Sequence, residues 1–140
     1  MMQEPIYKLI RPFSKLFHAT VSKLFPEMEK RAFKVLDVAA GTGLLGLELN
    51  KLGYSNIDAL DISREMMNHA RSKNVYKKFM YTAMTDQRTA DIKTGEYDAL
   101  TCSGAVGSAH VRPSVFDEMI RIFKPGKTKL TSSRAYSRTF

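Results

Sequence analysis

The stretch VLDVAAGTGLLG, residues 35–46, constrains the fold of this chain more than any other. It begins within a short run rich in Val and Leu, residues 34–39, which ends at a glycine-rich turn. Such a run is typical of a buried β-strand. Leucines at helical spacing follow over residues 42–53, where Gly53 is a natural stop. The stretch therefore predicts a strand, a tight glycine loop and a helix in immediate succession.

Strands and helices continue to alternate after this unit. Further strands are expected at residues 57–62, 78–84 and 97–103, with a fifth candidate at 127–133, and further helices at residues 63–73 and 113–126. Ser63 is placed to cap the first of these helices, and Glu65 lies in its first turn. Alternating strands and helices form βαβ units with right-handed crossovers. We therefore expect an α/β fold with a Rossmann-like, doubly wound, mostly parallel sheet.

The N-terminal residues predict a separate helical segment. Apolar side chains recur at helical spacing over residues 5–25, with a kink or break expected at Pro12. We expect this segment to pack on the core. A membrane-surface helix or a mitochondrial presequence is the alternative, because basic residues lie among the apolar ones. The chain then divides into a helical segment at 1–33, a core at 34–126 and a basic tail at 127–140.

Composition narrows the class of protein. The 140 residues have the length of one domain and contain no apolar run of about 18 residues, so no transmembrane helix is expected. Cys102 is the only cysteine, so no intrachain disulfide can form, and a reducing, cytoplasmic location is expected. We interpret Cys102 as a buried core thiol rather than a nucleophile. The three histidines are scattered, so no metal site is expected.

The net charge of +8 lies mainly near the C-terminus. Residues 121–140 carry six basic side chains and no acid, whereas the other 120 residues carry 16 basic and 14 acidic side chains. A basic tail can bind RNA or an acidic lipid surface electrostatically. A solvated chain end explains the same residues without a partner. Nucleic acid therefore stays an open alternative as a partner.

Two kinds of ligand fit the glycine loop. Gly41 to Gly46 spell G-x-G-x-x-G, the spacing of loops that bind a dinucleotide pyrophosphate through backbone N–H groups. Asp37, at the end of the first strand, would repel a pyrophosphate. S-adenosylmethionine instead carries an ammonium and a sulfonium, which favour nearby acceptors. Asp61, at the end of the second strand, suits the ribose hydroxyls of either ligand. The acid before the loop therefore favours S-adenosylmethionine over NAD.

Residues from about 35 to 126 resemble the class I S-adenosylmethionine-dependent methyltransferases. VLDVAAGTG resembles their first motif, DISREMMNHAR the segment after it, and GEYDALTCSGAVGSAHVRP their fourth-strand region. The closest likeness is to the methyltransferase-like proteins named after the Williams–Beuren syndrome chromosomal region. In one departure, Ala39 stands where the family usually has the first glycine of its D-x-G-x-G-x-G pattern. Because a methyl group is a small addition, we expect cofactor binding to survive.

The resemblance implies a set of cofactor-binding residues. It implies a methionyl end lined by Asp37, Ala39, Gly41 and Gly43. It implies a ribose held by Asp61 and an adenine covered by Ile62 and Met66. It implies a rim at Met84, Thr85 and Asp86, with Ser103 near the sulfonium. Helix packing is the alternative role for Met66, and a solvated turn is the alternative for Asp86.

The chemistry leaves one candidate catalytic residue. Methyl transfer from a sulfonium is an in-line displacement, which orientation of the two reactants accelerates. A general base is needed only when the acceptor arrives protonated. His110 is placed to reach the site from the loop after the fourth strand, and a histidine hydrogen-bonded to the loop backbone is the alternative. The Asp/Asn-Pro-Pro-aromatic motif of amino-group nucleic-acid methyltransferases is missing from this region, which argues against adenine-N6 methylation.

The length of the chain leaves three functions open. The chain ends 14 residues after Gly126, whereas the sheet of the family normally continues over roughly 40–60 further residues. We therefore expect a C-terminally truncated sheet whose open edge favours self-association. The first function is a methyltransferase with a small-molecule substrate. The second is a catalytically impaired module that binds the cofactor or a partner, and the third is an NAD-dependent oxidoreductase.

Overall fold

The computed structural model describes residues 4–102, 113–126 and 130–132. In chain order its elements are α1 (Glu4–Leu24), β1 (Val35–Val38), α2 (Leu44–Lys51), β2 (Ile57–Leu60), α3 (Arg64–Ser72), β3 (Lys78–Met80), β4 (Ala99–Cys102), α4 (Pro113–Ile122) and β5 (Leu130–Ser132). The strands form one sheet in the order β3-β2-β1-β4-β5, and every pair in it is parallel. This order confirms the predicted Rossmann-like α/β fold.

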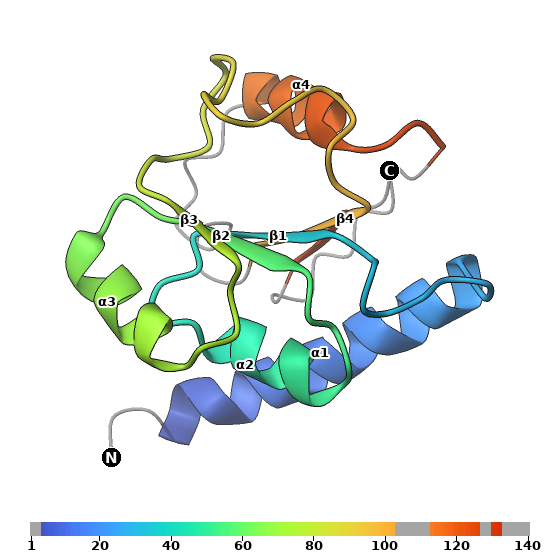
Figure 1. Cartoon of the computed structure of the whole chain (residues 1–140), viewed down its shortest axis with the longest axis vertical. Helices are drawn as coiled ribbons and strands as arrows, with labels where there is room; N and C mark the ends of the chain where they lie inside the picture. Colours follow the sequence, from blue (N-terminus) through green and yellow to red (C-terminus); the bar gives the residue numbers. More distant parts are fainter. Residues whose placement is uncertain (1–3, 103–112, 127–129, 133–140) are drawn as a thin grey trace.

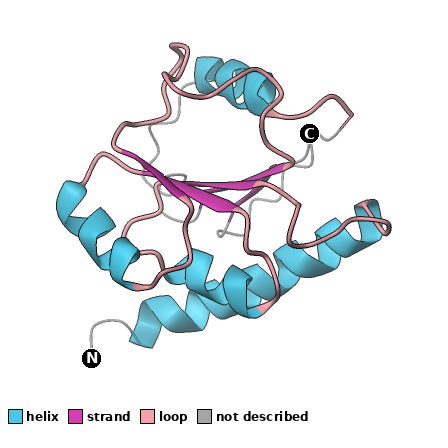
Figure 2. Ribbon diagram, viewed as in Figure 1, coloured by secondary structure: helices cyan, strands magenta, loops and turns pink. Residues whose placement is uncertain are grey.

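Helices cover both faces of the sheet. Figure 1 shows α1, α2 and α3 on one face and α4 on the other, and Figure 2 shows the sheet as the layer between them. Successive residues of a strand point to opposite faces. Val35 accordingly belongs to the core on the α1–α3 side, and Leu36 belongs to the core on the α4 side. All residues of β1, β2 and β4 are buried, as central strands covered on both faces must be.

The long N-terminal helix packs on the core, as expected. Ile10, Phe13, Phe17 and Val21 are buried on one face of α1 and join the core on that side of the sheet. The helix runs without a break through Pro12, so of the predicted kink or break the break is wrong, and the kink stays a prediction. Buried residues lie on both sides of this proline, and their packing outweighs the cost of about 3 kcal/mol that a proline imposes inside a helix. In the part of the chain that is described, no helix is long and apolar enough to cross a membrane.

Strands β2 and β3 are shorter than their apolar patterns predict. β2 ends at Leu60 and β3 at Met80, before the ends expected at residues 62 and 84. α4 likewise ends at Ile122, four residues before its expected end. The residues that follow β2 and β3 leave the sheet and form loops at its carboxyl edge. The fifth predicted strand is confirmed by β5, which lies at the outer end of the sheet. Self-association through this open edge stays a prediction.

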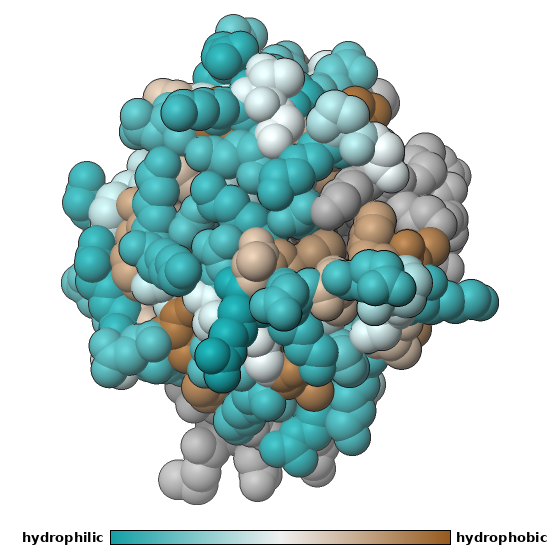
Figure 3. Space-filling view, turned by 45° about the vertical axis from the view of Figure 1, so that its right-hand side comes forward, coloured by the Kyte–Doolittle hydropathy of each residue, from teal (hydrophilic) through white to brown (hydrophobic). Residues whose placement is uncertain are grey.

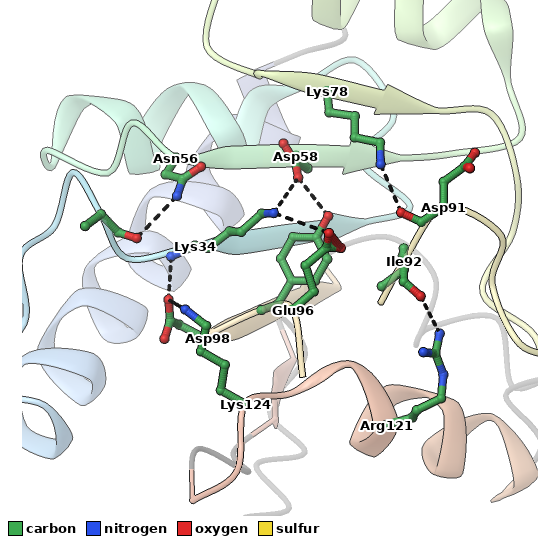
Figure 4. Close-up of polar contacts among 12 residues, drawn as sticks. Lys34, Asn56, Asp58, Lys78, Asp91, Ile92, Glu96, Asp98, Arg121 and Lys124 are labelled. Carbon is green, nitrogen blue, oxygen red and sulfur yellow. Dashed lines mark hydrogen bonds and ion pairs between the residues drawn. The ribbon is translucent and has the colours of Figure 1, made fainter. Parts of the chain in front are cut away.

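A network of ion pairs and hydrogen bonds lies where the strands begin (Figure 4). The N–H of Lys34, just before β1, donates to Asp98 at 2.8 Å, and the Nζ of Lys124 lies 3.0 Å from the same carboxylate. The Nζ of Lys34 lies 3.9 Å from Asp58 and 3.5 Å from Glu96. These contacts join β1, β2 and β4 at their amino ends.

On the face seen in Figure 3, hydrophilic side chains predominate and apolar residues form only small areas.

Candidate functional site

A cavity of about 240 Å³ opens at the opposite edge, where the strands end. Its lining residues are Val38, Ala39, Leu60, Asp61, Ile62, Thr82, Ala83, Met84, Cys102, Val115 and Met119. Most of these side chains are apolar, and Asp61 is the one carboxylate among them. In sheets of this topology, ligands bind outside the carboxyl ends of the strands, where the strand order reverses. Here that point lies between β1 and β4, beside the cavity.

The loop after β1 has an unusual backbone conformation. Ala39, Gly41 and Gly43 have φ angles of 55°, 59° and 87°, all in the left-handed region. Glycine adopts this region without steric cost, whereas an alanine pays about 1 kcal/mol or more. Ala39 is therefore strained, at a position that also lines the cavity. The geometry explains why a glycine suits this position better.

Asp61 joins the glycine loop to the start of α3. One of its carboxylate oxygens accepts the N–H of Gly41 at 2.8 Å, and the other accepts the N–H of Ser63 at 2.8 Å. The Ser63 hydroxyl then caps α3 by accepting the N–H of Met66 at 3.2 Å, as predicted. Because each carboxylate oxygen can accept a second hydrogen bond, Asp61 retains acceptor capacity toward the cavity.

Asp37 lies beneath the loop and has no exposed surface. Its carboxylate accepts hydrogen bonds from the hydroxyl of Tyr76 at 2.7 Å and from that of Thr101 at 3.1 Å. Burial raises the pKa of Asp37 to about 6, although these two hydrogen bonds act in the opposite direction. Burial and the neighbouring carboxylate raise the pKa of Tyr76, which therefore remains a donor.

The third glycine of the G-x-G-x-x-G pattern serves this buried contact. A Cβ atom on Gly46 would lie 2.2 Å from the hydroxyl oxygen of Tyr76. A side chain at position 46 would clash with Tyr76, so the glycine there lets the Tyr76 hydroxyl reach Asp37. The third glycine is thus explained by packing inside the protein, and a dinucleotide is not needed to account for it.

The other predicted site residues divide into two groups. Ile62 and Met84 line the cavity, and the side chain of Ile62 is 69% exposed. Met66 is 44% exposed, and its Cε lies 3.5 Å from where a Cβ on Gly41 would be. Thr85 and Asp86 are exposed and lie outside the lining of the cavity.

Two predicted residues, Ser103 and His110, lie outside the described residues. Cys102 is buried, as expected of a core thiol, and its side of β4 faces the cavity. Within residues 4–102, 113–126 and 130–132, no group of three His, Cys, Asp or Glu side chains is placed to hold a metal ion.

The sequence did not reveal several residues that shape the site. Val115 and Met119 lie four positions apart on α4, so they share the helix face that covers the cavity. The sequence shows the spacing of these two residues, but it does not show which face of the sheet α4 covers. Tyr76 and Thr101 gave no signal, because a hydrogen bond to Asp37 from residues this distant in sequence depends on the assembled sheet.

Comparison with known proteins assigns the fold to a family. Residues 35–126 match the family described as a methyltransferase domain. The chain belongs to this family. It is 29% identical over 115 residues to the biotin biosynthesis bifunctional protein BioHC of Saccharophagus degradans, covering 81% of this chain and 20% of that protein. It is 28% identical over 103 residues to the human methyltransferase-like protein 27, covering 74% of this chain and 41% of that protein. The chain thus spans less than half the length of these relatives.

Solved methyltransferase structures share the fold. A putative S-adenosylmethionine-dependent methyltransferase from Methanococcus maripaludis superposes with a TM-score of 0.70 at 22% identity, covering 94% of this chain and 60% of that one. The plantazolicin methyltransferase BpumL, solved in complex with SAH, superposes with a TM-score of 0.69 at 15% identity, covering 87% and 45%. The family and the shared fold together confirm the expected class I methyltransferase type of fold.

Proposed function

We propose that this chain is an S-adenosylmethionine-dependent methyltransferase that binds its cofactor in the cavity at the carboxyl ends of β1 and β2 and transfers the methyl group to a small-molecule acceptor. The observation that carries the proposal is the position of Asp61. Its carboxylate accepts hydrogen bonds from the glycine loop and from the start of α3. It also lines the cavity, where its oxygens can accept further hydrogen bonds. Membership of the methyltransferase domain family supports the same reaction.

The residues of the cavity match the parts of the cofactor. Its apolar lining, with Ile62 and Met84 at the rim, suits the faces of an adenine. Asp61 would accept hydrogen bonds from the ribose hydroxyls. Backbone N–H groups of the glycine loop would meet the methionyl carboxylate, with Ala39, Gly41 and Gly43 allowing a close approach. Large apolar side chains exposed in the described part of the chain are few, and two of them, Ile62 and Met66, flank this site.

The transfer step needs few groups from the protein. The bound cofactor supplies an electrophilic methyl group on a sulfonium. The protein holds the acceptor in line with that methyl group, which accelerates a displacement without further chemistry. His110 is proposed as a base for an acceptor that arrives protonated.

The proposal also includes the affiliation with the Williams–Beuren methyltransferase-like proteins, which the similarity to a human methyltransferase-like protein supports.

The division of the chain into residues 1–33, 34–126 and 127–140 remains part of the proposal. A reducing, cytoplasmic location also remains, because Cys102 is the only cysteine. A module that binds the cofactor without turnover is the second candidate. Methyl transfer to an acceptor in cell extract separates the two: labelled product supports the enzyme, and binding without product supports the module.

Calorimetric titration with S-adenosylmethionine, SAH and NAD tests the proposal. We expect both sulfur compounds to bind and NAD not to bind. Asp61→Asn should weaken binding of both sulfur compounds about tenfold or more, because an amide cannot accept hydrogen bonds at both positions. The matched control is Asp91→Asn, an exposed acid outside the cavity, which should leave both affinities unchanged. Binding of NAD alone, or an unaltered affinity in Asp61→Asn, would overturn the proposal.

A further inference from the structure

In the described part of the chain, no cation lies beside the buried carboxylate of Asp37. It has no exposed surface, and its described hydrogen-bond donors are the neutral hydroxyls of Tyr76 and Thr101. Among the residues that the structure describes, Asp37 forms no ion pair. An ionised carboxylate is costly to bury unless a positive charge compensates it.

The charged groups around Asp37 do not supply that compensation. From the end of β2, Asp61 adds a second negative charge, which acts against ionisation of Asp37. From the C-terminal end of α3, the Nζ of Lys73 donates to the backbone carbonyl of Thr42 at 2.6 Å, which holds this cation on the glycine loop. The loop before β3 and strand β4 contribute the hydroxyls of Tyr76 and Thr101. A cation that entered the cavity would therefore contact Asp61 and lie in the electrostatic field of Asp37.

Asp37 cannot contact such a cation directly. The next two residues, Val38 and Ala39, line the cavity, whereas Asp37 itself does not. Its charge must act through the glycine loop, across a part of the protein from which water is excluded. Coulomb interactions are weakly screened there, so the charge of Asp37 can change the affinity for a cationic ligand severalfold without direct contact.

We propose that Asp37 is a specificity-determining residue whose buried charge makes the site prefer the sulfonium form of the cofactor over the demethylated product. This inference rests on the proposed function. The two compounds share the adenosine and the amino-acid portion, so contacts by Asp61 or by the glycine loop favour both alike. They differ in the methyl group and in the charge on sulfur.

The reaction itself removes the charge that Asp37 attracts. An electron pair of the acceptor forms a bond to the methyl carbon, the bond between sulfur and that carbon breaks, and its electron pair stays on sulfur. The sulfur is then neutral. The attraction to Asp37 is lost at this moment, which weakens the hold on the product and favours its release.

Affinities for S-adenosylmethionine and SAH, measured by calorimetry from pH 5 to pH 8, test the inference. In the wild-type protein we expect the ratio of the two affinities to rise about fivefold to tenfold over this range. A bound cation favours the carboxylate form, so binding of S-adenosylmethionine should release a proton near pH 6, whereas binding of SAH should release less. In Asp37→Asn the ratio should be low and independent of pH. Asparagine is a matched replacement, because its amide can still pair with both hydroxyls.

A second variant keeps the charge and moves its titration. Tyr76→Phe removes a hydrogen bond that lowers the pKa of Asp37, so the rise of the ratio should shift to higher pH while its value at pH 8 is retained. A purely structural role of Asp37 would change both affinities together and leave their ratio alone. If Asp37→Asn binds both compounds with the wild-type ratio at every pH, the inference fails and the proposed function stands. If neither compound binds the wild-type protein, the proposed function fails and this inference fails with it.

Discussion

The two ends of the β-sheet hold their acidic side chains in different ways. Where the strands begin, buried Asp58 and Asp98 each lie within 4 Å of a lysine ammonium, at 3.9 Å and 3.0 Å. Where the strands end, Asp37 and Asp61 accept hydrogen bonds from hydroxyls and backbone N–H groups. In the described residues, neither acid at this end is paired with a cation.

The difference shows which acids stabilise the fold and which are available to a ligand. The pair of Glu118 and Arg121 on α4 illustrates the first class. Burial alone would raise the pKa of Glu118, but the hydrogen bonds from Arg121 and Thr89 outweigh it and lower that pKa to about 2. Asp37 shows the opposite balance, because its donors are neutral and burial prevails. An acid whose charge is left uncompensated in the folded chain is the one that a cationic ligand can stabilise.

The largest expected effect comes from filling the space beneath the glycine loop. Gly46→Ala should lower the free energy of unfolding by about 3 kcal/mol, because the new methyl group displaces Tyr76 and removes a donor from Asp37. Urea unfolding measures the loss. In a Tyr76→Ala background the same change should instead stabilise α2 by up to about 1 kcal/mol, since alanine is the better helix former. An equal loss in both backgrounds would contradict this role of Gly46.

At the other end, removing one member of a charge pair should also be costly. Asp98→Ala should lower the free energy of unfolding by about 2 kcal/mol or more, because it leaves the N–H of Lys34 and the ammonium of Lys124 without this acceptor. Glu27→Ala, which removes an exposed acid, is the matched control and should change stability little. If the affinity for S-adenosylmethionine fell as far in folded Asp98→Ala as in Asp61→Asn, the two ends would not be functionally distinct.

The pH dependence of stability separates the two classes of acid. The pKa of Asp37 is about 6 in the folded protein against an ordinary 3.8, so its contribution to stability is greatest at low pH and is lost as pH rises through 6. Relative to Asp37→Asn, the wild-type protein should lose roughly 1 kcal/mol between pH 5 and pH 7.5. Glu118 acts in the opposite direction, since its lowered pKa gives stability that is lost only as pH falls below 4.5.

Urea unfolding of both proteins at the two pH values checks this difference. Other titrating groups, including His18, change the free energy of unfolding with pH equally in both proteins, so their contribution cancels in the difference. Parallel pH profiles would show that Asp37 is not an uncompensated charge.

The smallest expected effect concerns the strained alanine of the loop. Ala39→Gly should raise the free energy of unfolding by about 0.5 kcal/mol, because glycine adopts the observed φ of 55° without a steric penalty, and this relief exceeds its entropic cost. Ala40→Gly is the matched control next to it, outside the left-handed region, and should lower stability by up to about 1 kcal/mol. Thermal unfolding measures both changes. Destabilisation of equal size in the two variants would argue against strain at Ala39.

Much of the fold could be predicted from the sequence because its signals are local. The buried runs at the central strands, the Ser63 cap and the glycine stops each depend on neighbours in the chain. Strand ends were less predictable: Ile62 and the mostly apolar residues 81–84 favour longer strands, but residues 61–62 and 82–84 lie beyond the strands and line the cavity.

The lining of the cavity could be predicted best at positions directly after a strand, and cofactor binding by these residues stays a prediction. Asp61 and Ile62 follow β2 and line the cavity, because parallel strands end at one edge. The burial of Asp37 under Tyr76 could not be read from the sequence, since it depends on the distance between a strand and a loop brought together by the sheet. The same limit applies to Gly46, whose spacing matches a nucleotide-binding pattern but whose surroundings show a packing role.

The most direct test of the difference between the two ends is a titration of the ¹⁵N-labelled protein with S-adenosylmethionine, followed by NMR of the backbone N–H groups. We predict that the largest shifts fall on Gly41, Ile62 and Ser63, at the carboxyl ends of the strands, while Lys34 and Asn56 at the amino ends stay unchanged. Shifts confined to Lys34 and Asn56, or a spectrum that the cofactor leaves unaltered, would contradict the account.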